Sequence, residues 1–190
     1  MQIESGNIRL IALTYEQVEM YRNTDYRLED SLGLKRTARI IAPQYSNALG
    51  RYTLSWMKED PANELFATVW IIVETASNSI AGEIGFKRKA DENGYIEIGY
   101  SIQVEYRNKG YITEAINLLS AWAFTHPEVK AILAETLDDN IHSIKALQNN
   151  GFKRFSYSRP FEPQDTGYTQ ETDKMIWHKL EKSNSKHEGK

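Results

Sequence analysis

The feature of the sequence that most constrains its fold is a run of three strand-like segments in the middle of the chain. The three segments are residues 65–74, 80–89 and 95–103, and they are rich in β-branched and aromatic residues. A polar break separates the first two, and Asn93-Gly94 precedes the third. Asn-Gly is a strong signal for a hairpin turn. The run therefore predicts two consecutive hairpins and three antiparallel strands.

Further helix-like and strand-like segments lie on both sides of this run. Before it we expect a strand at 7–13 and a helix at 14–23. Thr14 is the expected N-cap of this helix, with Gln17 as its reciprocal partner. A loop at 25–36, broken by Gly33, and a mostly helical stretch at 37–60, interrupted at Pro43, are expected to follow. After it we expect a helix that reaches about Phe124, a strand at 129–137, a helix at 140–150 between Asn140 as N-cap and Gly151, and strands at 152–159 and 173–181.

This order predicts an α+β fold with a mixed, mostly antiparallel central sheet of about seven strands, flanked by helices. The strands at 95–103 and 129–137 are connected through a helix. Such a connection favours a right-handed crossover between parallel strands.

The composition limits the classes of function. The chain has 190 residues, which predicts one domain at 1–182 and a flexible polar tail at 183–190. It has no cysteine, which excludes disulfides, thiolate metal sites and a cysteine nucleophile. A net charge of −3 argues against a nucleic-acid partner, and the 4 histidines lack metal-site spacing. Without a signal-peptide pattern or an apolar run of membrane-spanning length, we expect no membrane partner and a cytoplasmic location.

The stretch YRNKGYITEA, residues 106–115, places cations and a glycine where a helix begins. A helix N-terminus presents free N–H groups that favour an anion, and Gly110 permits close approach of a ligand. Arg107 and Lys109 add positive charge, and Thr113 adds a hydroxyl. The pattern fits a pyrophosphate site, but it also fits a tight turn with surface cations. The glycine patterns of P-loop and Rossmann nucleotide sites are absent from the sequence.

Two spaced motifs resemble the GNAT superfamily of acetyl-CoA-dependent N-acetyltransferases, and more closely its RimJ/RimL-like branch. The family's pyrophosphate loop is matched at Arg107 and Gly110. It departs from the family at Asn108, where glycine is usual, and at Ile112, where glycine or alanine is usual. The second motif is matched at Asn140, Ser143, Leu147, Gly151 and Phe152. The resemblance covers roughly residues 5–180. Ile112 either crowds the phosphates or packs beneath the helix.

The resemblance implies a GNAT fold and a set of acetyl-CoA contacts. The family binds the pantetheine arm with backbone groups at the end of the fourth strand, here Ile102, Gln103 and Val104. The pyrophosphate would lie on Arg107, Asn108, Lys109, Gly110, Tyr111, Ile112 and Thr113. Asn140 would contact the cofactor arm, although a plain N-cap explains it equally. The resemblance implies no metal, and dimers are frequent in the branch, so a homodimer is possible.

The implied reaction is direct attack of a primary amine on the acetyl thioester. Glu97 is the candidate base, because alternation puts it on the opposite face of its strand from Ile96 and Ile98. An ordinary exposed glutamate is the alternative, and Glu83 is a second candidate. Leu147 stands where many superfamily members carry a catalytic tyrosine, so Ser143 is the candidate acid, or merely a packing serine.

The acceptor is expected to be a protein N-terminus or a small-molecule amine. Acidic residues in the expected loop could attract it, or could be solvated surface charges; they are Asp25, Glu29 and Asp30. The alternative function is a non-catalytic acyl-CoA-binding sensor or scaffold of the same fold.

Overall fold

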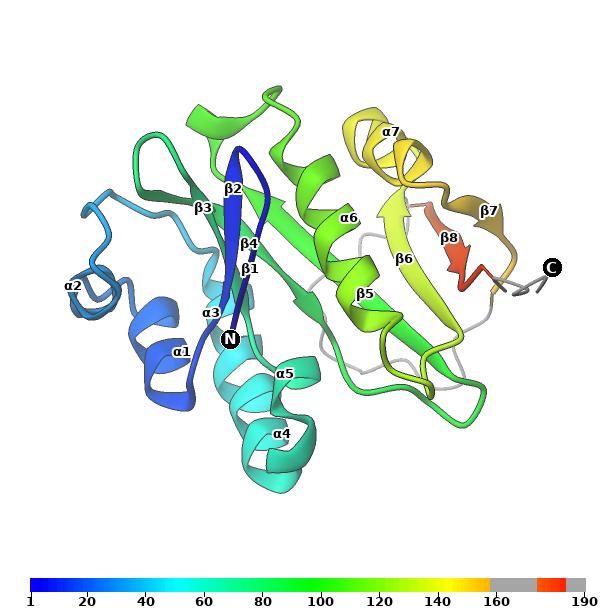
Figure 1. Ribbon diagram of the computed structural model, residues 1–190, viewed down its shortest axis with the longest axis horizontal. Coiled ribbons are helices and arrows are strands. Elements are labelled where there is room, and N and C mark those ends of the chain that lie inside the picture. Colours follow the sequence, from blue (N-terminus) through cyan, green and yellow to red (C-terminus); the bar gives the residue numbers. More distant parts are fainter. Residues whose placement is uncertain (158–173, 184–190) are drawn as a thin grey trace, which may run out of the picture.

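The computed structural model describes residues 1–157 and 174–183 of the chain, and within them it forms one sheet of 8 strands. The strands are β1 (Gln2–Glu4), β2 (Ile8–Ala12), β3 (Trp70–Glu74), β4 (Ser79–Phe86), β5 (Tyr95–Ile102), β6 (Ala131–Leu137), β7 (Lys153–Phe155) and β8 (Met175–Glu181). Their order across the sheet is β1-β2-β3-β4-β5-β6-β8-β7. Only β5 and β6 pair in parallel among these strands, as Figure 1 shows.

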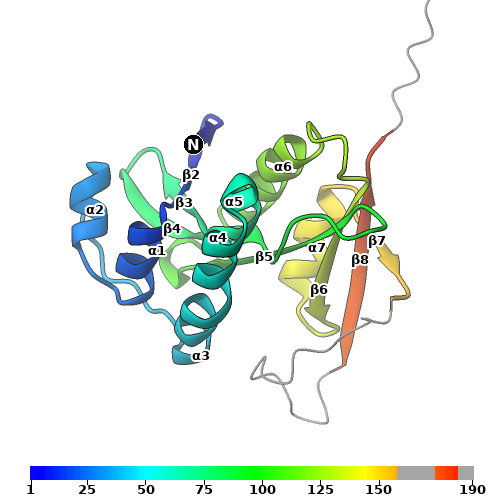
Figure 2. The same ribbon diagram turned by 90° about the horizontal axis from the view of Figure 1, so that it is seen from below.

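Helices connect these strands and cover the sheet. They are α1 (Tyr15–Arg22), α2 (Arg27–Leu32), α3 (Pro43–Ala48), α4 (Leu54–Glu59), α5 (Glu64–Ala67), α6 (Tyr111–Ala123) and α7 (Ile141–Asn149). A π-helical turn (Leu49–Thr53) joins α3 to α4, and short 3-10 turns lie at Pro61–Asn63 and Val104–Tyr106. Figure 2 shows α6 on one side of β4 and β5 and α3 on the opposite side.

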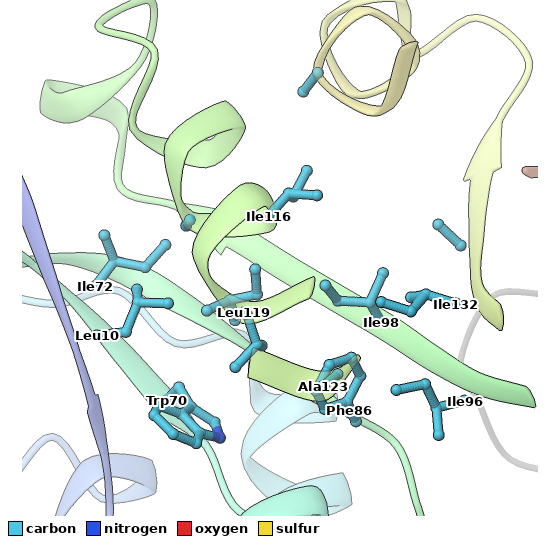
Figure 3. Packing of buried hydrophobic residues seen from close by; sticks show 14 of the residues in the cluster. Leu10, Trp70, Ile72, Phe86, Ile96, Ile98, Ile116, Leu119, Ala123 and Ile132 are labelled. Carbon is cyan, nitrogen blue, oxygen red and sulfur yellow. The ribbon is translucent and has the colours of Figure 1, made fainter. Parts of the chain in front are cut away.

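Each face of the sheet packs on its own hydrophobic core. On one face, Ile116 and Leu119 of α6 lie over Ile72 and Ile98 of the strands (Figure 3). On the other face, the apolar side chains of α1, α2 and α4 pack on Ile71 of β3. The residues of β3 are all buried, because alternate side chains enter the two cores. The sheet is therefore a rigid central layer between two sets of helices.

Most of the expected elements are confirmed. The two hairpins join β3, β4 and β5, and α6 carries the parallel crossover to β6. Thr14 caps α1 in a capping box with Gln17, and the side chain of Asn140 caps α7. The sheet has one strand more than expected, because β1 is too short to show a periodic pattern.

Three expectations in the first half of the chain were wrong. The expected loop at 25–36 contains α2, and Gly33 ends this helix in a left-handed conformation. Pro43 does not interrupt a helix but begins α3, where its missing N–H costs nothing. The expected strand at 65–74 begins as α5, and only Trp70 onward is a strand. Short apolar runs fit a buried helix and a buried strand equally well.

Part of the expected C-terminal structure lies outside the described residues. This applies to the ends of the strands expected at 152–159 and 173–181, to the connection between them, and to the tail from 184 onward.

Candidate active site

A wedge opens where β5 and β6 stop pairing. Their parallel pairing runs from Tyr95 and Ala131 to Ile98 and Ala134. Beyond this point β5 pairs only with β4, and β6 pairs only with β8, within the described residues. Residues 99–102 and 135–137 therefore face each other across a gap in the ladder (Figure 1). Their free backbone groups need partners from a ligand or water.

The loop at the mouth of this wedge presents a helix N-terminus. Gly110 precedes α6 with a φ of 83°, and the first backbone hydrogen bond of the helix runs from Glu114 N–H to Gly110 O at 3.1 Å. The N–H groups of residues 110–113 have no backbone acceptor among the described residues. Four free N–H groups and the helix dipole together favour an anion.

Asn108 has a φ of 61°, in the left-handed region. Glycine is usual at this position in the branch that the sequence resembles. Asparagine is one of the few other residues that adopt this conformation readily. The replacement of glycine by Asn108 therefore preserves the path of the loop.

The two cations of the loop are placed differently. The Lys109 ammonium lies 3.4 Å from a carboxylate oxygen of Glu74 on β3, and it also contacts the rings of Tyr106 and Tyr111. The hydroxyl of Tyr111 donates to the same carboxylate, which raises the pKa of Tyr111 to about 12. Arg107 is exposed, so its guanidinium is free to turn toward an anion at the helix N-terminus.

Of the two expected positions of Ile112, crowding the phosphates or packing beneath the helix, the structure shows the second. Its side chain packs against the core that contains Ile116 and Leu119 of α6. Its branched side chain therefore does not narrow the anion site. The neighbouring Thr113 is held through its carbonyl, which accepts a hydrogen bond of 3.0 Å from Asn150 at the end of α7. This bond connects the first turn of α6 to α7.

The end of β5 is partly occupied by other contacts. The backbone N–H of Gln103 donates to the carbonyl of Ala81 at 2.8 Å, so it is not available to a cofactor arm. The side-chain amide of Gln103 pairs with both backbone groups of Ile40, at 3.4 Å each. Of the three expected pantetheine contacts, Ile102 and Val104 retain the more accessible backbone groups, and the segment around Ile40 lies beside them.

Ser143 lies across the wedge from β5. Its backbone N–H donates to Asn140 Oδ1 at 3.2 Å, and its hydroxyl lies 2.8 Å from the hydroxyl of Tyr100. Burial raises the pKa of the Tyr100 phenol, and the Ser143 hydrogen bond opposes that rise. Leu147, at the position of the tyrosine found in many superfamily members, is fully buried in the main core. Sequence reasoning had missed Tyr100, although it belongs to the same EIGY segment as Glu97.

Glu97 faces the side of β5 that is opposite to Tyr100. Its carboxylate forms an ion pair with Lys87, and its side chain is 17% exposed. It lies two residues before Gly99, at the closed end of the wedge. Gly99 and Ser101 follow on the same face and are exposed. This face of β5 is therefore open to solvent beyond Glu97.

The acidic residues at 25–30 do not form an open anionic surface. Asp25 pairs with Arg27, and Asp30 pairs with Arg36. Glu29 is fully buried in an ion pair with Arg39, so the interpretation as a solvated charge was wrong for this residue.

Within the part of the chain that the structure describes, no group of His, Asp or Glu side chains is arranged to hold a metal ion. In the same residues, no helix has both the length and the apolar character needed to cross a membrane.

The structure is thus a mixed sheet that opens between two parallel strands, with a free helix N-terminus at the opening. The chain matches the family model of the acetyltransferase (GNAT) domain over residues 16–153. It is 29% identical over 150 residues to the uncharacterized N-acetyltransferase YjdG of Bacillus subtilis (strain 168), a match that covers 79% of this chain and 88% of that protein. The chain belongs to the GNAT family and is an N-acetyltransferase.

Solved structures with low sequence identity share the fold. The ribosomal-protein-S5-alanine acetyltransferase from Vibrio fischeri has a TM-score of 0.66 at 15% identity, covering 97% of this chain and 98% of that one. The microcin C7 self-immunity acetyltransferase MccE, in complex with acetyl-CoA and AMP, has a TM-score of 0.60 at 18% identity and covers 93% of both chains.

Proposed function

We propose that this protein transfers an acetyl group from acetyl-CoA to a primary amine, by direct attack while both substrates are bound. The observation that carries the proposal is the wedge between β5 and β6, with the N-terminus of α6 at its mouth and Ser143 on its far side. Two solved relatives support the choice of donor, because MccE is bound to acetyl-CoA and the ribosomal L7/L12 α-N-protein acetyltransferase RimL is bound to coenzyme A.

The residues at the mouth fit the phosphates of this donor. The N–H groups of residues 110–113 would bind the pyrophosphate, and Arg107 would add charge-assisted hydrogen bonds. Backbone groups of Ile102 and Val104 would bind the pantetheine arm. The Asn140 side chain caps α7 through Oδ1, which leaves its amide N–H groups for the same arm.

The amine must lose a proton before it can attack. A free alkyl ammonium has a pKa of about 10.4 and a terminal α-ammonium of about 8, so both are protonated at neutral pH. Glu97 is proposed to accept this proton through water, because it lies on the face of β5 from which the acceptor approaches. The neutral amine then attacks the acetyl carbonyl carbon, and the new C–N bond replaces the C–S bond.

The leaving thiolate also needs a proton. Ser143 is proposed to supply it from its hydroxyl, and the hydrogen bond to Tyr100 orients that hydroxyl. The attacking nitrogen loses a second proton to the serine oxygen, which restores the serine hydroxyl. The products are the acetamide and coenzyme A, with one proton released from Glu97 to solvent.

The first test is thermal unfolding with and without acetyl-CoA. A ligand at a hundredfold excess over its dissociation constant adds about 2.7 kcal/mol of stability, which raises the midpoint by several degrees in a domain of this size. We expect Gly110→Glu to abolish the shift, because its carboxylate repels the pyrophosphate and the φ of 83° disfavours any side chain. The same protein is then assayed for coenzyme A release with a panel of primary amines.

The absence of the superfamily tyrosine at Leu147 favours a second candidate, a non-catalytic acyl-CoA sensor. A sensor would show the thermal shift but would release no coenzyme A above the rate of spontaneous hydrolysis with any amine. A shift that persists unchanged in Gly110→Glu would contradict both candidates.

A further inference from the structure

Three glutamates of the described chain are buried, and two of them are paired with a cation. Glu29 pairs with Arg39, and Glu74 lies 3.4 Å from the Lys109 ammonium. The third, Glu83 in the middle of β4, is 6% exposed and forms no ion pair with a described lysine, arginine or histidine. Because buried charges are normally paired, Glu83 lacks the partner that this fold provides for its other buried carboxylates.

Hydroxyl groups surround the Glu83 carboxylate. Tyr21 of α1 donates to Glu83 Oε2 at 2.5 Å, and Ser101 lies directly opposite Glu83 on β5. Tyr45 on α3 is 37% exposed as a residue, and burial followed by the charge of Glu83 raises the pKa of its phenol. A carboxylate has about four lone-pair sites, so these donors do not exhaust it.

Neighbouring charges do not neutralise this carboxylate. The guanidinium of Arg39 lies 5.5 Å from the ring centre of Tyr21, but it already forms an ion pair with Glu29 of α2. Burial raises the pKa of Glu83, while hydrogen bonds from Tyr21 and Ser101 oppose the rise. A cation that entered beside Ser101 would keep the carboxylate ionised.

This carboxylate lies beside the wedge. Ser101 belongs to the half of β5 that β6 does not cover, and it is exposed on the face that carries Glu97. Gly99 precedes it on this face, and a Cβ added there would meet nothing within 4 Å. Adjacent strands are about 4.8 Å apart, so Glu83 is one strand away from the open face of β5.

We propose that Glu83 and the hydroxyls of Tyr21 and Ser101 bind an ammonium group of the acceptor, and that the acceptor is an alkyl diamine or longer polyamine. This proposal rests on the proposed acetyl transfer. A nitrogen held as an ammonium on Glu83 is not a nucleophile, so a second nitrogen of the same molecule must react. The approach to a carboxylate that is only 6% exposed suits an unbranched methylene chain. An α-amino group carries its branches next to the nitrogen and does not fit this approach.

The test compares three acceptors in a coenzyme A release assay with the full chain. The acceptors are 1,4-diaminobutane, butylamine and a peptide with an N-terminal serine. For the wild type we expect a KM for the diamine at least about tenfold below that for butylamine, because the second ammonium gains a charge-assisted hydrogen bond. Glu83→Gln keeps the shape of the side chain and removes its charge. We expect it to raise the KM for the diamine about tenfold, and with it the ratio of the diamine KM to the butylamine KM, whatever its effect on kcat.

Controls separate a binding role from a structural role. Glu4→Gln changes a glutamate of the edge strand β1, which β2 and β3 separate from β4, and it should leave all three KM values unchanged. The thermal shift with acetyl-CoA should be the same in Glu83→Gln as in the wild type. Ser101→Ala, which removes the hydroxyl opposite Glu83, should also raise the KM for the diamine.

Equal KM values for diamine and butylamine in the wild type, a preference for the peptide, or an unchanged diamine KM in Glu83→Gln would each overturn the inference. Calorimetric binding of 1,4-diaminobutane to the coenzyme A complex tests it without turnover. If the wild type releases no coenzyme A with any amine but binds the diamine in a Glu83-dependent way, the proposed acetyl transfer fails and the ammonium site stands.

Discussion

The buried ion pair between Glu29 and Arg39 predicts a large and asymmetric effect on stability. The side chains are 0% and 1% exposed, so neither charge is solvated in the folded protein. Replacing Arg39 with methionine would leave the Glu29 carboxylate buried without its partner, which costs about 3–5 kcal/mol. It also removes the cation–π contact with Tyr21, worth about 0.5–2 kcal/mol. Because a domain is stable by only about 5–15 kcal/mol, this single change should remove a large fraction of the stability.

The reverse effect is expected when both partners are replaced. The double variant Glu29→Leu with Arg39→Met buries no charge, so we expect it to recover most of the lost free energy of unfolding. Urea unfolding followed by far-ultraviolet circular dichroism gives the four free energies of the double-mutant cycle. Replacing the exposed pair by neutral residues, Asp30→Asn with Arg36→Gln, serves as the control and should change stability little.

The reasoning is refuted if Arg39→Met unfolds at nearly the wild-type urea concentration, or if the double variant is no more stable than Arg39→Met. Either result would mean that water reaches the Glu29 carboxylate and replaces the guanidinium.

Two further predictions concern the reaction, and a third concerns the pH dependence of folding stability. Glu97→Gln should lower turnover near neutral pH and regain activity at alkaline pH, where the amine deprotonates by itself; full activity near neutral pH would contradict its role as base. Ser143→Ala and Tyr100→Phe should each lower kcat about tenfold with little change in KM, and the double variant should lose little more than either, since both act on one hydrogen bond. The pKa of Tyr111, raised to about 12, favours folding below about pH 10, the usual pKa of tyrosine, and this contribution is lost as the pH rises toward about 12. Unfolding measured across this range should therefore depend less on pH in Tyr111→Phe than in the wild type.

The parts of the fold that could be predicted depend on contacts between residues close in sequence. The capping box of Thr14 and Gln17 and the N-cap at Asn140 are formed by side chains within three residues of the groups they bind. The turn at Asn93-Gly94 depends on local backbone preferences. The short helix α5 could not be predicted, because Phe66 is as apolar as a strand residue and only the core decides its conformation.

The candidate site divides in the same way. The loop at 107–113 and the Asn140–Ser143 turn are contiguous segments, so the sequence resemblance identified both. The proposed acceptor site comes from three separate elements, because Tyr21, Glu83 and Ser101 lie on α1, β4 and β5. No spacing in the chain links these residues.

The sequence by itself determined the order of the elements, the hairpins, the parallel crossover and the loop before α6, because each depends on backbone preferences and hydrogen bonds within a few residues. The tertiary structure alone decided which charges are neutralised. Arg39 reaches Glu29 and Lys109 reaches Glu74 only after the helices and loops have packed on the sheet, whereas no cation of the described chain reaches Glu83. Coulomb energy and desolvation depend on distance and burial, which the packing of distant segments sets.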